Sequence, residues 1–283
     1  MALIGLAADK GAPGVTTSAL VLAAVWPRPV LLAECDPAGG DLGYWLPAAD
    51  GSPLDPHRGL LSLAVATRRG AQPQQVWEHT QKLRGGLDVL TGVTTAEQAA
   101  GLEPLWGSVG SALSRLPQAD VIADCGRLGP DGRHYDLLAH AAAIVLITRD
   151  SLGEVVRLRE RIAALSAALA RRERAGVPVG AVVISGRKEF HSALVEVRQA
   201  LGRGAAEVIG GLAFEPVSAA QLHGEWGGKL DRSLLVRTAR AVASQLAAAG
   251  SSVPPAEPPP VPPASAVRPA PVPRHRVNGT PRA

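Results

Sequence analysis

Seven short apolar runs, separated by longer stretches with helical spacing, constrain the fold of this chain more than any other feature. The runs are rich in Val, Ile and Leu, as expected for strands buried on both faces of a parallel sheet. Strands that alternate with helices predict an α/β fold: a doubly wound, mostly parallel sheet flanked by helices. The predicted strands are Leu3–Ala8, Val30–Cys35, Leu87–Thr91, Val121–Cys125, Ala143–Thr148, Val179–Ser185 and Val208–Ala213.

The first run leads into a glycine-rich loop, two threonines and an apolar helix. The segment reads Lys10-Gly11-Ala12-Pro13-Gly14-Val15-Thr16-Thr17. Small residues let successive backbone N–H groups turn inward around an anion, and the following helix directs its positive end to the same place. The segment therefore predicts a phosphate-binding loop, with Thr16 placed to reach a phosphate-bound Mg²⁺. The ordinary P-loop carries a lysine directly before this threonine, and Val15 stands there instead. A plain strand-to-helix turn is the alternative, and it leaves Lys10 and the paired threonines unexplained.

Two carboxylates follow at the ends of predicted strands. Asp36 comes directly after the run Val30–Cys35, and Asp124 lies near the end of the run Val121–Cys125. Because ligands of doubly wound sheets bind at the carboxyl ends of the strands, both carboxylates are predicted to lie beside the glycine loop.

In their sequence order, these motifs resemble those of the ParA/MinD superfamily of ATPases, and the resemblance covers residues 1 to about 247. The loop is similar to the deviant Walker A motif K-G-G-x-G-K-[ST]-[ST], with Lys10 in the place of its first, "signature" lysine. Residues 30–40 resemble V-L-L-x-D-x-D-P-Q-G, and residues 120–126 resemble the Walker B strand. The second lysine of the loop is replaced by Val15, a loss similar to that in the CpaE/TadZ branch. That branch helps to place pilus and secretion machinery at a cell pole.

The resemblance implies a P-loop NTPase-like domain at residues 1–250 that binds ATP and Mg²⁺. It assigns Thr16 and Asp124 to the metal, and Asp36 and Lys10 to catalysis. In the family, the carboxylate corresponding to Asp36 helps to orient the attacking water, and the signature lysine reaches the nucleotide of the partner subunit, so a homodimer is implied. The implied cofactor-binding residues are Lys10, Gly11, Ala12, Gly14, Val15, Thr16 and Thr17.

Two functions of different class are compatible with these residues. One is a weak ATPase that acts as a dimer switch and positions a cargo such as a chromosome, a plasmid or a secretion apparatus. The other is a non-catalytic scaffold that keeps the fold and binds protein partners. The absent lysine favours the scaffold, because losing one such phosphate contact slows transfer about 10²–10³-fold.

The stretch Ser151–Arg174 is the clearest predicted helix. Its apolar residues recur every three or four positions, and six arginines occupy the other face: Arg157, Arg159, Arg161, Arg171, Arg172 and Arg174. Such a face is either solvated or a site for non-specific DNA or acidic lipid. The solvated alternative is favoured. Residues 1–250 carry a net charge of only +1, because the tail holds four arginines and one glutamate of a chain whose net charge is +4.

Residues 251–283 form a separate segment with eleven prolines among 33 residues. This composition predicts a disordered, partly polyproline-II tail, which serves either as a solubilising appendage or as a docking segment. The tail has none of the amphipathic pattern of a membrane-binding C-terminus, so stable membrane insertion is not expected. With two cysteines, Cys35 and Cys125, and no signal peptide, the chain is expected to be cytoplasmic with reduced thiols.

Overall fold

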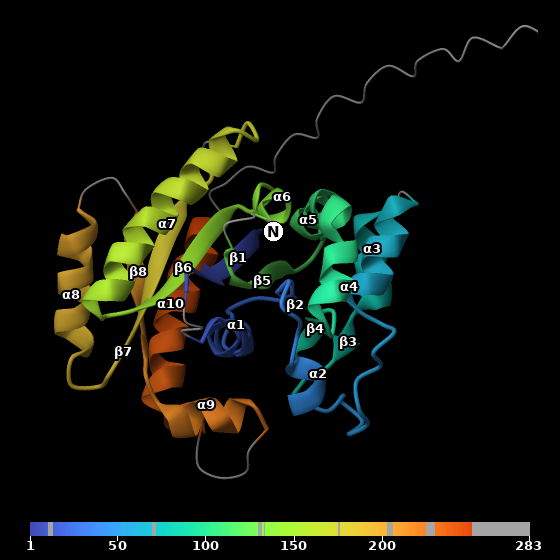
Figure 1. The fold of residues 1–283 in the computed structure, drawn as a ribbon. Helices are drawn as coiled ribbons and strands as arrows, with labels where there is room; N and C mark the ends of the chain where they lie inside the picture. Colours follow the sequence, from blue (N-terminus) through green and yellow to red (C-terminus); the bar gives the residue numbers. More distant parts are fainter. Residues whose placement is uncertain are drawn as a thin grey trace, which may run out of the picture.

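The computed structural model describes residues 1–10, 14–69, 72–129, 132, 134–174, 176–202, 206–224 and 230–250. Within these residues, eight strands form one sheet in the order β3-β4-β2-β5-β1-β6-β7-β8 (Figure 1). Strand β3 pairs antiparallel with β4, and the other strand pairs are parallel. The strands are β1 (Leu3–Ala8), β2 (Val30–Glu34), β3 (Gln81–Lys82), β4 (Asp88–Leu90), β5 (Asp120–Arg127), β6 (Ala143–Arg149), β7 (Val179–Ser185) and β8 (Glu207–Ala213). The predicted α/β fold with a mostly parallel sheet is confirmed.

Each of the seven apolar runs forms a strand, and the bounds of β1 and β7 are those predicted. Strand β3 was not predicted, because two residues with polar side chains carry no apolar pattern. It is an edge strand, paired only through Gln81 and Lys82 with β4 in the described chain.

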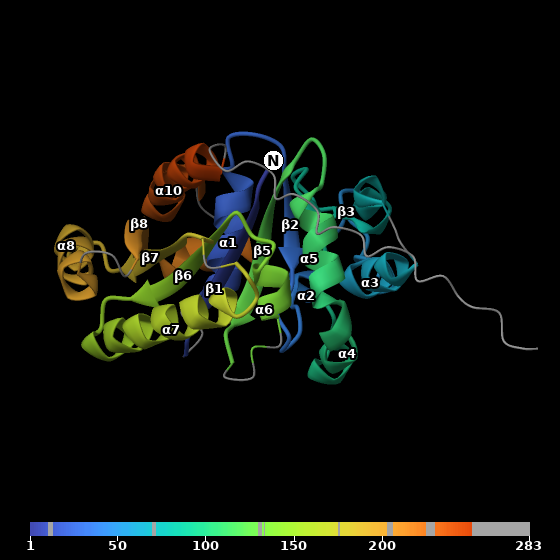
Figure 2. The ribbon, with the colours of Figure 1, turned by 90° about the horizontal axis from the view of Figure 1, so that it is seen from above.

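Helices cover both faces of the sheet, and Figure 2 shows α10 and α7 on opposite sides of it. The α-helices are α1 (Val15–Ala24), α2 (Leu42–Trp45), α3 (Leu60–Arg68), α4 (Ala96–Gly101), α5 (Trp106–Ser114), α6 (Tyr135–Leu138), α7 (Leu152–Ala170), α8 (Phe190–Leu201), α9 (Pro216–Leu222) and α10 (Leu234–Gly250). Short 3₁₀ turns lie at Pro73–His79, Glu103–Leu105 and Leu230–Arg232.

The core has two layers, because successive side chains of a strand point to opposite faces of the sheet. In β1, Leu3 and Ala7 belong to the layer beneath α3, α5, α6, α7 and α8. Ile4 and Leu6 belong to the other layer, beneath α1 and α10. Leu42 of α2 and the loop residues Leu54 and Leu83 belong to this second layer as well, so shorter segments cover the sheet near β2 and β4 (Figure 1).

Helix α7 begins one residue later and ends four residues earlier than predicted. Its apolar stripe is buried as expected, but its arginines do not form one solvated face. Arg161 is half-buried and pairs with Asp9, with 2.5 Å between Nε and Oδ1. Arg172, just beyond the helix, pairs with Asp136 at the same distance. These two arginines are therefore occupied within the chain.

Three predicted features lie outside the described residues: the loop residues Gly11 and Ala12, and the tail 251–283. In the described part of the chain, none of the helices has the length and apolar character needed to cross a membrane. Both cysteines are free thiols in the core.

Candidate functional site

The candidate site lies between the end of β1 and the start of α1, at the carboxyl edge of the sheet. Gly14 precedes α1 with φ +97°, a left-handed conformation that glycine adopts without strain. In the described residues, no side chain caps this end of the helix. Its first backbone N–H groups are therefore available to an anion, and they carry the positive end of the helix dipole.

Val15 is the first residue of α1, and it is a core residue. Its side chain is 5% exposed and packs in the layer beneath α1 and α10. The position that carries a lysine in the ordinary P-loop is thus filled by an apolar side chain that contributes no charge to the loop.

Thr16 and Asp124 meet beneath the loop. Asp124 lies near the end of β5 with 2% of its surface exposed. Its carboxylate accepts hydrogen bonds from the Thr16 hydroxyl and from the backbone N–H of Gly126, the latter at 3.0 Å. Burial disfavours the charged form and raises the pKa of Asp124 to about 7, although both hydrogen bonds act in the opposite direction.

Asp36 lies directly against this pair. Strands β2 and β5 are neighbours, with Glu34 opposite Asp124, so the residues beyond β2 arrive at the same place. The Asp36 carboxylate packs on the backbone of Gly126, whose φ is +55°, and any side chain at Gly126 would overlap it. Burial raises the pKa of Asp36, and its hydrogen bond from the Ala38 N–H, at 2.8 Å, opposes that shift.

Glu34 has a structural role. It is 2% exposed, and its two carboxylate oxygens accept hydrogen bonds from the N–H groups of Leu42 and Gly92, each at 2.9 Å. Burial raises the pKa of Glu34, against these hydrogen bonds. The side chain therefore holds the segment that follows β2 against the end of β4.

Lys10 stands at the rim of the site, in the turn after β1, and its side chain is exposed. It borders a small hollow together with Thr148 of β6 and Leu158 of α7. The preceding residue, Asp9, is fixed by its ion pair with Arg161. An exposed ammonium at this rim is accessible to a second molecule.

A cavity of about 170 Å³ opens beside Gly14, Thr17 and Ser18. The ends of β7 and β8 and the start of α9 form its other walls, with Phe214 and Pro216 among the lining residues. Arg149 lies over the Phe214 ring, with its guanidinium carbon 5.0 Å from the ring centroid. The nearby Ser185 hydroxyl donates to Asp150 at 2.6 Å, so it is engaged within the chain.

His223 is a site residue that sequence reasoning missed. Its Nε2 lies 3.1 Å from the Thr17 hydroxyl, and its ring stacks on Trp45 with centroids 4.2 Å apart. The histidine follows α9, 206 positions from the threonine, and no local motif marks it.

The residues present fit a magnesium ion bound together with a phosphate. In the described part of the chain, no group of three or more His, Cys, Asp or Glu side chains could hold a metal ion. Magnesium at nucleotide sites typically takes one or two protein oxygens and completes its shell with phosphates and waters. Thr16 and Asp124 supply oxygens of that kind beside the uncapped end of α1.

Comparison with protein-family models and with curated protein sequences finds no match. Solved structures do match. A ParA family ATPase from Chlorobium tepidum TLS is 18% identical with a TM-score of 0.62, over 87% of this chain and 98% of its own. MinD from Pyrococcus horikoshii OT3, complexed with Mg-ADP, is 13% identical with a TM-score of 0.59, over 87% and 95%. A variant of McdA from Cyanothece in complex with ATP is 15% identical with a TM-score of 0.64, over 87% and 96%.

The chain therefore has the fold of the ParA, MinD and McdA ATPases. At these identities the likeness establishes the fold, and the roles of individual residues depend on the geometry described above.

Proposed function

We propose that this protein binds ATP with Mg²⁺ and acts as a weak or degenerate ATPase of the ParA/MinD kind, which positions a cellular cargo such as a chromosome, a plasmid or a pilus or secretion apparatus. The observation that carries the proposal is the contact of Thr16 with Asp124 beneath an uncapped helix N-terminus, with Asp36 beside them. Burying the Asp124 carboxylate with the partly buried Asp36 beside it costs stability, and a bound cation would offset that cost.

Each residue has a role in this proposal. Gly14, Thr16 and Thr17 would bind phosphates with the backbone and hydroxyls of the loop, and Gly11 and Ala12 would complete it. Thr16 and Asp124 would hold Mg²⁺, which neutralises phosphate charge when it is bound. Asp36 would orient a water for attack on the terminal phosphate. The cavity beside Gly14 and Thr17 would receive the base.

Val15 sets the strength of the activity. A lysine in its place would put a full positive charge where negative charge accumulates during phosphoryl transfer. Because Val15 is apolar and buried, the neutral loop is expected to bind ATP more weakly and to hydrolyse it slowly. This departure is the feature shared with the CpaE/TadZ branch.

Lys10 supports a homodimer. Its exposed ammonium at the rim would contact the nucleotide of a second copy, so that ATP would hold two copies together. The solved structures with this fold include a MinC:MinD complex from Aquifex aeolicus, so a protein partner is also part of the proposal. Arg157 and Arg159 of α7, which form no ion pair within the described part of the chain, leave non-specific DNA as a further partner.

A second candidate is a scaffold that binds protein partners without ATP turnover, and the buried Val15 is the observation that favours it. Calorimetry of ATP binding with and without Mg²⁺, read beside the sedimentation state, separates the two. The switch requires Mg²⁺-dependent ATP binding that Asp124→Asn weakens. A chain that binds no ATP in either condition is a scaffold.

A further inference from the structure

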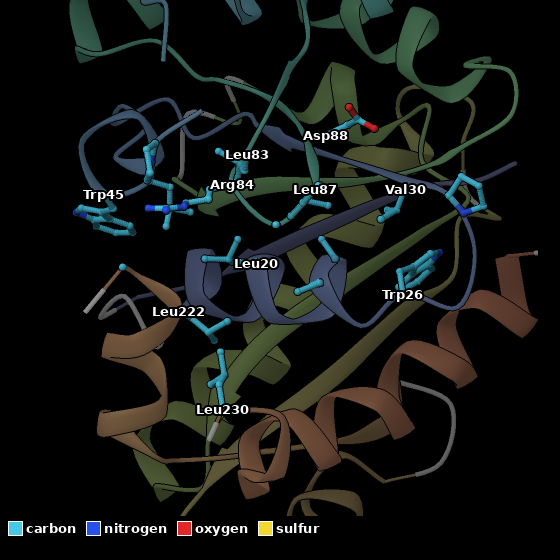
Figure 3. A pocket seen from close by; sticks show the side chains of 18 of the residues that line it. Leu20, Trp26, Val30, Trp45, Leu83, Arg84, Leu87, Asp88, Leu222 and Leu230 are labelled. Carbon is cyan, nitrogen blue, oxygen red and sulfur yellow. The ribbon is translucent and has the colours of Figure 1, made fainter. Parts of the chain in front are cut away.

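A second cavity, of about 730 Å³, runs along α1 on the side facing β4. We call it the tryptophan groove, because Trp26, Trp45 and Trp77 line it. Figure 3 shows Trp45 at one end and Trp26 at the other, with Leu20 of α1 between them. The chain has five tryptophans and is only 3% aromatic, so three of them at one cavity are a marked concentration.

The groove lies between α1 and the segments that cover this face near β2 and β4, among them α2 with Trp45. Leu87 and Val30, at the starts of β4 and β2, form part of its wall. Trp45 and Leu87 remain partly exposed there, whereas Trp26 is 8% exposed. The groove is therefore lined by apolar side chains, with Trp45 as a partly exposed ring at one end, and by the charged residues Arg28, Arg84 and Asp88.

The proline-rich tail starts at one end of this groove. Gly250, the last residue of α10, packs against Ala2 and lies close to Arg28. Arg28 donates from Nη2 to the carbonyl oxygen of Ala247 at 2.9 Å, and it also lines the groove beside Trp26. The last described residue of α10, Gly250, therefore lies next to the Trp26 end.

We propose that residues 254–263 of the same chain occupy the tryptophan groove as a polyproline-II segment. Seven of the eleven tail prolines lie in this stretch. Polyproline-II ligands dock in aromatic-lined grooves, where proline rings pack on indoles and the extended shape is formed in advance. The groove and the segment thus have matching chemistry, and the proposal does not depend on nucleotide binding.

The lengths agree. Residues 251–253 span at most about 10 Å, which is enough to enter at Trp26. Ten residues of polyproline II extend about 31 Å, and ten helical residues rise about 15 Å, so the segment can pass along the whole of α1. The charges of the segment and of the groove are also opposite in sign. Glu257 is the single acid of the tail, and Arg84 lies exposed beside Trp45 (Figure 3).

The test places a nitroxide spin label on the tail of the full chain and records the indole N–H signals by NMR. The label is attached to Ala256→Cys, because the native Cys35 and Cys125 are buried and do not compete. We expect the signals of Trp26 and Trp45 to broaden several-fold more than that of Trp106, which is buried in the other core layer. Equal broadening of all signals, or none, overturns the proposal.

Three matched samples complete the test. The same label on Thr280→Cys, beyond the proline run, should leave Trp26 and Trp45 much sharper. Replacing the seven prolines of 254–263 with serine should restore the signals in the Ala256→Cys chain, and persistent broadening there overturns the polyproline-II assignment. Mixing isotope-labelled chains with separately spin-labelled chains should leave the signals sharp, and broadening in the mixture would assign the groove to the tail of a second copy instead.

Discussion

The hydroxyl of Thr17 and the imidazole of His223 lie 3.1 Å apart and join the first turn of α1 to the end of α9. The same imidazole stacks on Trp45, so the first turn of α1 is connected through one ring to the tryptophan groove. If Thr17 contacts a phosphate, its hydrogen bond with His223 must be exchanged or shared when nucleotide binds.

The first prediction tests that exchange. His223→Phe keeps a ring to stack on Trp45 but removes the hydrogen bond to Thr17. A neutral hydrogen bond contributes about 0.5–1.5 kcal/mol, so ATP affinity should rise by about 2- to 10-fold. Calorimetry measures the change, and His57→Phe, at an exposed histidine, is the control. Weaker ATP binding in His223→Phe would mean that the imidazole assists the nucleotide.

The second prediction concerns the missing charge. Val15→Lys should strengthen ATP binding about 10-fold, because the ammonium can extend from the first turn of α1 toward the phosphates. Val15→Met lengthens the buried side chain without adding charge, and it controls for repacking. Equal affinities of the two variants would show that the loop does not hold phosphate at this position.

The third prediction concerns Lys10. In a dimer that shares its nucleotide, ATP and dimerisation strengthen each other by the same factor. We expect Mg-ATP to shift wild type toward a weak dimer in sedimentation velocity, and Lys10→Ala to abolish that shift without changing the melting temperature. Lys188→Ala, at another exposed lysine, should behave as wild type. If the mass distribution of wild type is the same with and without Mg-ATP, the proposed ATP-dependent dimer is wrong.

The fourth prediction follows from Asp124, whose pKa is raised to about 7 by burial. Between about pH 4 and pH 7 the folded chain holds a proton on this carboxyl that the unfolded chain has released. The free energy of unfolding should therefore fall as pH rises through this window, by at most about 1.4 kcal/mol per pH unit. Asp124→Asn carries no such proton, so its urea midpoint should depend less on pH. If the urea midpoints of wild type and Asp124→Asn changed with pH in the same way, the raised pKa of Asp124 would be refuted.

The fifth prediction concerns Asp120, which is fully buried at the start of β5. It accepts hydrogen bonds from the Ala2 N–H at 2.8 Å, Trp26 Nε1 at 2.9 Å and Arg28 Nε at 2.6 Å. Asp120→Ala would leave buried donors without their acceptor, so stability should drop by about 3–5 kcal/mol. Asp120→Asn keeps an acceptor and should lose less. Chemical denaturation gives the loss of stability in both variants. Equal losses would show that the negative charge of Asp120, and not its role as an acceptor, stabilises the fold.

Much of the fold was predictable from the sequence, because buried parallel strands leave a direct signal. Val179–Ser185 is apolar up to its last residue, Ser185, and both its bounds were predicted. The sequence also predicted that Asp36 and Asp124 lie close together, because neighbouring parallel strands end at the same edge of the sheet. Strand β3 escaped prediction because a two-residue edge strand has no periodicity.

The contacts that complete the site could not be predicted from local pattern. Thr17 and His223 are 206 positions apart, and their meeting depends on how α9 packs beside α1. The tryptophan groove likewise needs segments around Trp26, Trp45 and Leu87 to converge. The pairing of Arg161 with Asp9 spans 152 positions and removes one arginine from a face that helical periodicity alone assigned to solvent.

The place of β1 in the middle of the sheet governs the order in which the chain can be assembled. Leu3 pairs with Val121, and Ile4 pairs with Ala143, so β1 has both neighbours more than a hundred residues further along the chain. At about 5–20 residues per second, β1 waits for roughly 7–30 s before β6 is made. Such distant pairings also slow folding. A nascent chain of this protein therefore carries an unpaired apolar strand during synthesis, and β1 is the segment that chaperones for such strands would bind.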